Sequence, residues 1–156
     1  MHSEKRLPGN GKEACIFMLT VSIISVNIIA PLIMGMEHGF SLNNYLNTLR
    51  IIPFLWIAVL LLVNFVSRPL VSKLVMKFIT PTDSFNARIL FNILFSVLIL
   101  SVLLTVIGSW IGRQEISMDP LYNFFHIWPR NFFIAFWVEM IIAQPIARKV
   151  MLFIHK

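Results

Sequence analysis

Long apolar stretches separated by short polar segments dominate the chain. The apolar stretches run from Ala14 to Met36, from Ile51 to Ser67, from Ile89 to Gly112 and from Asn131 to Ala147. Each approaches the roughly 20 apolar residues that a helix needs to cross the hydrocarbon core of a bilayer. The pattern therefore predicts four transmembrane helices.

The second half of the chain echoes the first half at a constant offset of 76 positions. The paired positions include Ser25 with Ser101, Pro53 with Pro129 and Pro69 with Pro145. Because each half contains two predicted spans, both halves enter the membrane in the same orientation, and a pseudo-twofold axis along the membrane normal relates them. The predicted fold class is all-α transmembrane, a four-helix bundle made of two tandem parallel-repeat helical hairpins.

This prediction divides the chain into segments. They are an N-terminal tail (1–13), a first hairpin (14–80), a connection (81–88) and a second hairpin with a basic C-terminal end (89–156). Composition agrees, because 58% of the residues are hydrophobic and only 13% are charged. In soluble domains about a quarter of the residues are charged. A membrane protein whose main partner is the lipid bilayer is therefore expected.

The formal net charge of +6 is distributed unevenly. Of the 13 Lys and Arg residues, all but Arg50, Arg113 and Arg130 lie in the N-terminal tail, between the second and third predicted spans or near the C-terminus. Short loops rich in Lys and Arg stay on the cytoplasmic side of a membrane. We therefore predict a multi-pass protein with both termini in the cytoplasm. The scattered charges do not form the basic patch of a nucleic-acid-binding protein.

Glu139 is the acidic residue that lies well inside an apolar stretch. Since a charge there is costly, an intramembrane carboxylate marks a functional site by default. Ala135, Glu139, Ala143 and Ala147 form one narrow stripe of small residues at helical spacing. The stripe would bury Glu139 against another helix, which suits proton binding. Alternatively, Glu139 only fastens helices together by hydrogen bonding to a serine or threonine of the third span.

Other polar side chains inside the predicted spans complete the candidate proton or substrate site. They are Ser101 and Thr105 of the third span and Asn64 of the second. Interhelical hydrogen bonds are their simplest role, and lining a small polar path is the alternative.

Pro69 and Pro145 lie at the cytoplasmic ends of the second and fourth predicted spans. Proline bends or stops a helix because it lacks an N–H and its ring clashes with the preceding turn. Both prolines are candidate hinges of a cytoplasmic cavity. The alternative is that each span turns there into a short amphipathic segment on the lipid headgroups.

No enzyme signature is present: the sequence has no Gly-rich phosphate loop, no zinc-protease motif and no nucleophile elbow. His38 and His126 have no second ligand at useful spacing, so no metal site is expected. We expect no cofactor and no catalytic residue.

The segments "SRPLVSKLVMKF" and "AQPIARKVMLF" each combine a proline with basic residues at the end of an apolar helix. With a serine-bearing first helix in each hairpin, the chain resembles the uncharacterised bacterial membrane family Domain of Unknown Function 2798, from about Cys15 to Lys156. The resemblance implies the fold and a bacterial cytoplasmic membrane. It implies no activity, substrate or catalytic residue.

The leading functional expectation is a small transporter unit that is proton-coupled through Glu139. A homodimer is expected because four helices enclose little central space. The alternative is a non-transporting accessory, immunity or stress-related protein that binds another membrane protein.

Overall fold

The computed structural model describes residues 5–156, and this part of the chain is helical without any strand. Residues 1–4 of the predicted tail lie outside the described residues. The helices are α1 (Gly11–His38), α2 (Leu42–Leu62), α3 (Arg68–Phe78), α4 (Phe85–Arg113), α5 (Asp119–Tyr122), α6 (Phe124–Val138) and α7 (Gln144–Ile154). The π-helical turns η1 (Val63–Ser67) and η2 (Glu139–Ala143) join α2 to α3 and α6 to α7. The all-helical prediction is confirmed.

Polar side chains cap the helices that open each hairpin. The Asn10 side chain accepts a hydrogen bond from the Glu13 N–H at 3.0 Å, and Ser84 accepts one from Ala87 at 3.2 Å. Such caps satisfy backbone donors that have no partner in the first turn. At the other end of α1, Gly39 has a φ of 93°, a conformation that costs glycine little. These signals extend α1 and α4 beyond the predicted apolar stretches.

Three helices are long and apolar enough to cross a membrane: Gly11–His38, the continuous helix Leu42–Phe78, and Phe85–Arg113. Large apolar side chains also point outward, as shown by Phe65 and Phe133, which are 76% and 63% exposed. A soluble domain would bury many of these side chains. Together these features indicate a membrane protein.

The predicted fourth span lies in the continuous helix 124–154. This helix is not among the three that are both long and apolar enough to cross a membrane. Its polar residues Asn131, Glu139 and Gln144 lower its mean hydropathy. The length of the helix suffices, because 20 helical residues cover about 30 Å.

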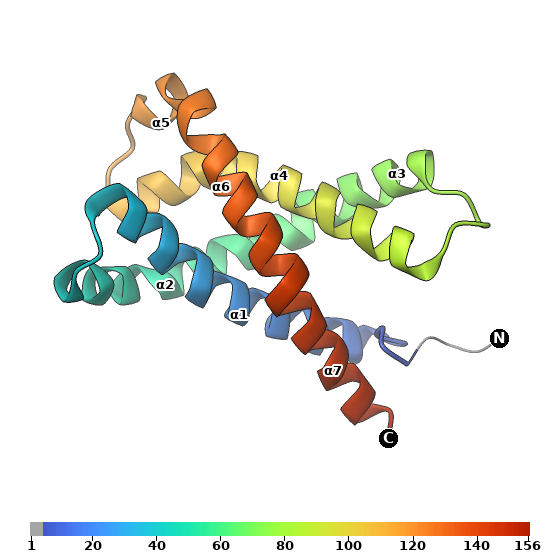
Figure 1. The fold of residues 1–156 in the computed structure, drawn as a ribbon. Coiled ribbons are helices and arrows are strands. Elements are labelled where there is room, and N and C mark those ends of the chain that lie inside the picture. Colours follow the sequence, from blue (N-terminus) through green and yellow to red (C-terminus); the bar gives the residue numbers. More distant parts are fainter. Residues whose placement is uncertain (1–4) are drawn as a thin grey trace.

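The long helices that contain the π turns each contact both α1 and α4. Helix α1 packs on α2 and also on α6, η2 and α7, whereas α4 packs on α6 and also on α2, η1 and α3. The start of α1, the α3–α4 connection and the C-terminus lie at one end of the molecule (Figure 1). The α1–α2 connection and α5 lie at the other end. The segments rich in Lys and Arg are therefore on the same side.

A tryptophan ties the two helices of each hairpin together. The Trp56 indole N–H donates to the Ser22 hydroxyl at 2.9 Å, and the Trp128 indole N–H donates to the Ser101 hydroxyl at 2.9 Å. A buried indole N–H needs such a partner. Hence an indole hydrogen bond joins the two long helices of each hairpin.

Neither candidate hinge proline stops its helix. Pro69 and Pro145 occupy the first turns of α3 and α7, directly after the two π turns. The carbonyls that their rings would meet in an α-helix, four residues earlier, lie inside the widened turns, which accommodate the rings. The helices continue as the 11-residue segments α3 and α7, and their position on the lipid headgroups stays a prediction. Hinge motion at these positions stays a prediction.

Candidate functional site

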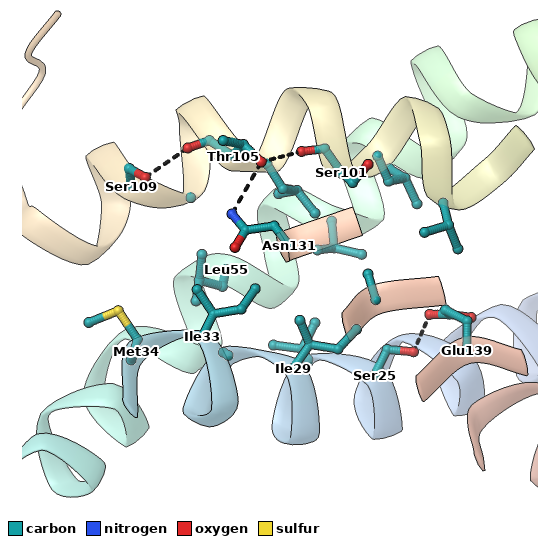
Figure 2. Close-up of a pocket in the computed structure, with 18 of the residues that line it drawn as sticks. Ser25, Ile29, Ile33, Met34, Leu55, Ser101, Thr105, Ser109, Asn131 and Glu139 are labelled. Carbon is teal, nitrogen blue, oxygen red and sulfur yellow. Dashed lines mark hydrogen bonds between the residues drawn. The ribbon is translucent and has the colours of Figure 1, made fainter. Parts of the chain in front are cut away.

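A cavity lies between the two hairpins, with lining residues from α1, α2, α4, α6 and the first residue of η2. The volume of this cavity is about 150 Å³. Figure 2 shows the polar side chains of α4 facing Ile29 and Ile33 of α1 across this space. A concave site with an apolar surface and a few polar groups is the usual form of a small-molecule site.

Equivalent positions of the two halves line the cavity. The lining pairs at the offset of 76 are Ser25 with Ser101, Ile29 with Thr105, Ile33 with Ser109, Leu55 with Asn131 and Val59 with Ala135. The chemistry of the two sets differs. Beyond Ser25, the first-half set is aliphatic, whereas the second-half set carries hydroxyl and amide groups. The cavity therefore has an apolar wall (Ile29, Ile33, Leu55, Val59) and a polar wall (Ser101, Thr105, Ser109, Asn131).

The polar wall is held by its own hydrogen bonds. The Thr105 hydroxyl donates to the Ser101 carbonyl at 2.7 Å and accepts from the Asn131 amide at 3.2 Å. The Ser109 hydroxyl donates to the Thr105 carbonyl at 2.7 Å. Helical Ser and Thr commonly return their hydroxyl hydrogens to the backbone in this way. What they present to the cavity is then mainly oxygen lone pairs.

Glu139 opens η2 and borders the cavity, so its side chain is only partly exposed. Its carboxyl group hydrogen-bonds with the Ser25 hydroxyl of α1, and the two side chains point toward each other in Figure 2. The expected partner on the third span is therefore wrong. Ala143 and Ala147, the small residues after Glu139, are completely buried, and η2 and α7 pack on α1. This close approach of α1 brings Ser25 to the carboxyl group.

An ion pair lies at the opposite end of the cavity. The Arg130 guanidinium donates to the Glu37 carboxylate at 2.8 Å and to the Asn131 side-chain oxygen at 3.2 Å. Glu37 is a lining residue, and the two paired side chains keep 31% (Arg130) and 23% (Glu37) of their accessible surface. Sequence reasoning missed Glu37 and Asn131. Both residues lie at the ends of apolar stretches, where a polar residue usually marks only the boundary of a span. Their position at these ends was the only feature of the sequence that could have indicated a role in the site.

The structure brings together three of the four predicted site residues. Glu139, Ser101 and Thr105 all line the cavity, although the Ser101 hydroxyl is already bonded to Trp128 and to the Leu98 carbonyl. Asn64 does not line it, which corrects that prediction. Its side chain is exposed in η1 and donates to the Leu60 carbonyl at 2.8 Å.

A second cluster of charged groups joins α7 to α1 at the end that carries the C-terminus. The His155 ring contacts the Lys5 carbonyl at 2.8 Å and the Glu13 carboxylate at 2.9 Å. The hydrogen bond to the Lys5 backbone, followed by the one to Glu13, raises the pKa of His155 above its ordinary value. Within residues 5–156 no group of three His, Cys, Asp or Glu side chains is placed to hold a metal ion.

Comparison with known proteins gives a match to a family model. Neither the curated proteins nor the solved structures include a significant match to this chain. The family match begins at residue 84, so it covers less than the predicted resemblance from Cys15 to Lys156. It has nearly the length of the 76-residue offset between the halves. Residues 84–155 match the family model described as Domain of unknown function (DUF2798), so the second half of the chain is similar to that family.

Proposed function

We propose that this protein is a small carrier in a bacterial cytoplasmic membrane and that it moves a solute through the cavity between its two hairpins. The observation that carries the proposal is the position of Glu139, a carboxyl group inside an apolar helix bordering a cavity. Intramembrane carboxyl groups are costly and line transport pathways or proton relays in many membrane proteins.

The proposal includes four spans and a duplicated hairpin with both termini in the cytoplasm. The five cavity-lining pairs and the two π turns at the same offset support the duplication. The location of the basic segments at one end of the molecule supports the orientation. In this arrangement helix 124–154 is the fourth span, and its polar residues face the cavity or neighbouring helices instead of lipid.

The hydrogen bonds of Ser25 support proton binding at Glu139. The Ser25 hydroxyl lies 2.7 Å from the Val21 carbonyl and also contacts Glu139. A hydroxyl has one hydrogen, so it cannot donate to both oxygens at once. If Glu139 is protonated, it donates to Ser25, and Ser25 donates to Val21. A protonated carboxyl group thus lets both contacts of Ser25 form together, whereas after loss of the proton the Ser25 hydrogen can serve only one of the two oxygens.

A cycle follows from these contacts. A solute that enters the cavity displaces the proton of Glu139, and the proton rebinds after the solute leaves. The Glu37–Arg130 ion pair, 2.8 Å long, closes the outer end in the observed state. Proline hinges at Pro69 and Pro145 would open the inner end. No enzymatic activity, cofactor or metal is part of the proposal, and a homodimer stays a prediction.

The Ser25–Glu139 contact favours a second candidate function. It joins α1 to η2, so Glu139 also fits a protein that uses this contact only to hold its helices. Such a protein would be an accessory, immunity or stress-related factor that binds another membrane protein. The two functions differ in what Glu139→Gln changes, because an amide keeps the volume and the hydrogen bonds but cannot exchange a proton.

The test is proton movement in proteoliposomes containing wild type, Glu139→Gln or Glu115→Gln. Glu115 is an exposed residue outside the cavity, so its variant controls for the chemical change alone. A carrier predicts solute-driven proton flux in wild type and Glu115→Gln, and none in folded Glu139→Gln. Equal flux in all three proteins contradicts the role of Glu139. Absence of flux from folded wild type, with a panel of cations and amino acids, favours the accessory function.

A further inference from the structure

We infer that the cavity binds a small organic cation, an alkyl- or arylalkylammonium ion with at most one benzene-sized ring, with the charge at Glu139 and the hydrocarbon part on the apolar wall. This inference rests on the proposed function and names its substrate class.

The charges around the cavity favour a cation. Among the described lining residues, the charged ones are Glu37 and Glu139. Glu37 is neutralised by Arg130, whereas Glu139 has no ion pair within residues 5–156. Its hydrogen-bond partners are the uncharged side chains of Ser25 and Gln144. A cation that displaces the proton of Glu139 therefore restores a neutral site. An anion would bring a second negative charge beside a carboxyl group.

The hydrogen-bonding groups that line the cavity also favour a cation. The hydroxyl hydrogens of Ser101, Thr105 and Ser109 all point to backbone carbonyls, at 3.0, 2.7 and 2.7 Å. These side chains consequently offer lone pairs and no free donor. An ammonium group carries only donors and so complements them. A carboxylate or phosphate would find few donors in the cavity.

The apolar wall argues against a metal ion. Calcium and magnesium take about six or more oxygen ligands in a closed shell. Near Glu139 the apolar wall supplies aliphatic carbons, and Ser25 is the hydroxyl that contacts the carboxyl group. Hydrocarbon groups of a solute gain free energy by leaving water for such a wall, at about 25 cal/mol per Å². The two walls thus suit an ion that is apolar at one end.

The size of the cavity sets an upper limit. Its free space of about 150 Å³ equals that of an engineered apolar protein cavity, about 150 Å³, that takes up benzene. Larger dyes with several fused rings would not fit without rearrangement. A single ring or a short branched alkyl group is the expected hydrocarbon part.

The experiment compares three probes of similar shape: benzylammonium, benzyl alcohol and benzoate. Binding to the purified full chain is measured by titration calorimetry at a pH where the amine is protonated. We expect benzylammonium to bind at least tenfold more tightly than the other two probes. Glu139→Gln should lose at least tenfold in benzylammonium affinity, and Glu115→Gln should bind like wild type.

A second variant keeps the test decisive if Glu139→Gln does not fold. Ile29→Phe fills the apolar wall and retains Glu139, so it should weaken benzylammonium binding while the smaller methylammonium still binds. Equal binding of benzoate or benzyl alcohol, unchanged affinity in folded Glu139→Gln, or no binding of benzylammonium would overturn the inference.

The two proposals fail in different ways. Benzylammonium binding without flux in proteoliposomes would refute the carrier and leave the binding site intact. Glu139-dependent proton flux that is driven by other solutes, with no effect of ammonium ions, would refute the substrate class and keep the carrier.

Discussion

The hydroxyl of Ser25 on α1 hydrogen-bonds with the carboxyl group of Glu139 in η2, 114 residues further along the chain. This contact joins the first helix of one hairpin to the second helix of the other. It also borders the cavity, so the same pair of residues serves both the packing of the bundle and the chemistry proposed for it.

Replacing Ser25 with alanine removes this contact and leaves Glu139 without its hydroxyl partner. We expect Ser25→Ala to lower the free energy of unfolding by about 1 kcal/mol, the typical scale of a hydrogen bond between membrane helices. Unfolding in mixed micelles measures it. Ser117→Ala is a matched control, because the buried Ser117 hydroxyl has no hydrogen-bond partner within the described residues. Equal losses in the two variants would contradict a specific role for Ser25.

The Glu37–Arg130 pair should restrict access to the cavity from the outer end. In a chain with Cys15→Ser and Thr105→Cys, we expect Glu37→Gln to accelerate labelling of the new thiol by an impermeant reagent added outside. An exposed ion pair is worth up to about 1 kcal/mol, which corresponds to roughly fivefold in rate. Glu115→Gln serves as the control. If Glu37→Gln does not change the labelling rate, the ion pair does not restrict access to the cavity.

The contact of His155 with Glu13 and the Lys5 carbonyl should make the docking of α7 on α1 sensitive to pH. Because the pKa of folded His155 is raised, its contribution to stability is complete below the unfolded value of about 6.5. The contribution is lost as the pH rises through the folded pKa. Hydrogen exchange in α7 should therefore be faster at alkaline pH after correction for the intrinsic rate.

His155→Ala should abolish this pH dependence and leave exchange in α7 fast at all pH values. His38→Ala, at the opposite end of α1, is the control and should behave like wild type. Protection in α7 that is independent of pH in wild type would contradict the role of His155.

Reporter fusions test the proposed orientation. Fusions after His38 and Asp119 should report an extracytoplasmic location, and a fusion after Asp83 should report the cytoplasm. The reason is that the Lys- and Arg-rich segments share the end of the molecule that carries the α3–α4 connection, and Asp83 belongs to this connection. Any other pattern excludes four spans with both termini in the cytoplasm.

Much of the fold follows from local chemistry in the sequence. Apolar stretches near the length of a membrane span become helices because every backbone group must be satisfied within lipid. Polar caps at Asn10 and Ser84 begin helices, and the spacing of Pro69 and Pro145 marks equivalent places in two segments. Glu139 is recognisable as a candidate because the free-energy cost of a carboxyl group in an apolar helix can be judged from that one segment of the sequence.

The partners of these residues depend on packing between distant segments, which only the tertiary structure decides. The π turns set which way Glu139 and Asn64 face, so one residue reaches the cavity and the other becomes exposed. The burial of Ala143 and Ala147 brings α1 close enough for Ser25 to contact Glu139. Local sequence is enough to place a carboxyl group within an apolar helix. Helix packing determined that this group faces a cavity with one apolar and one polar wall.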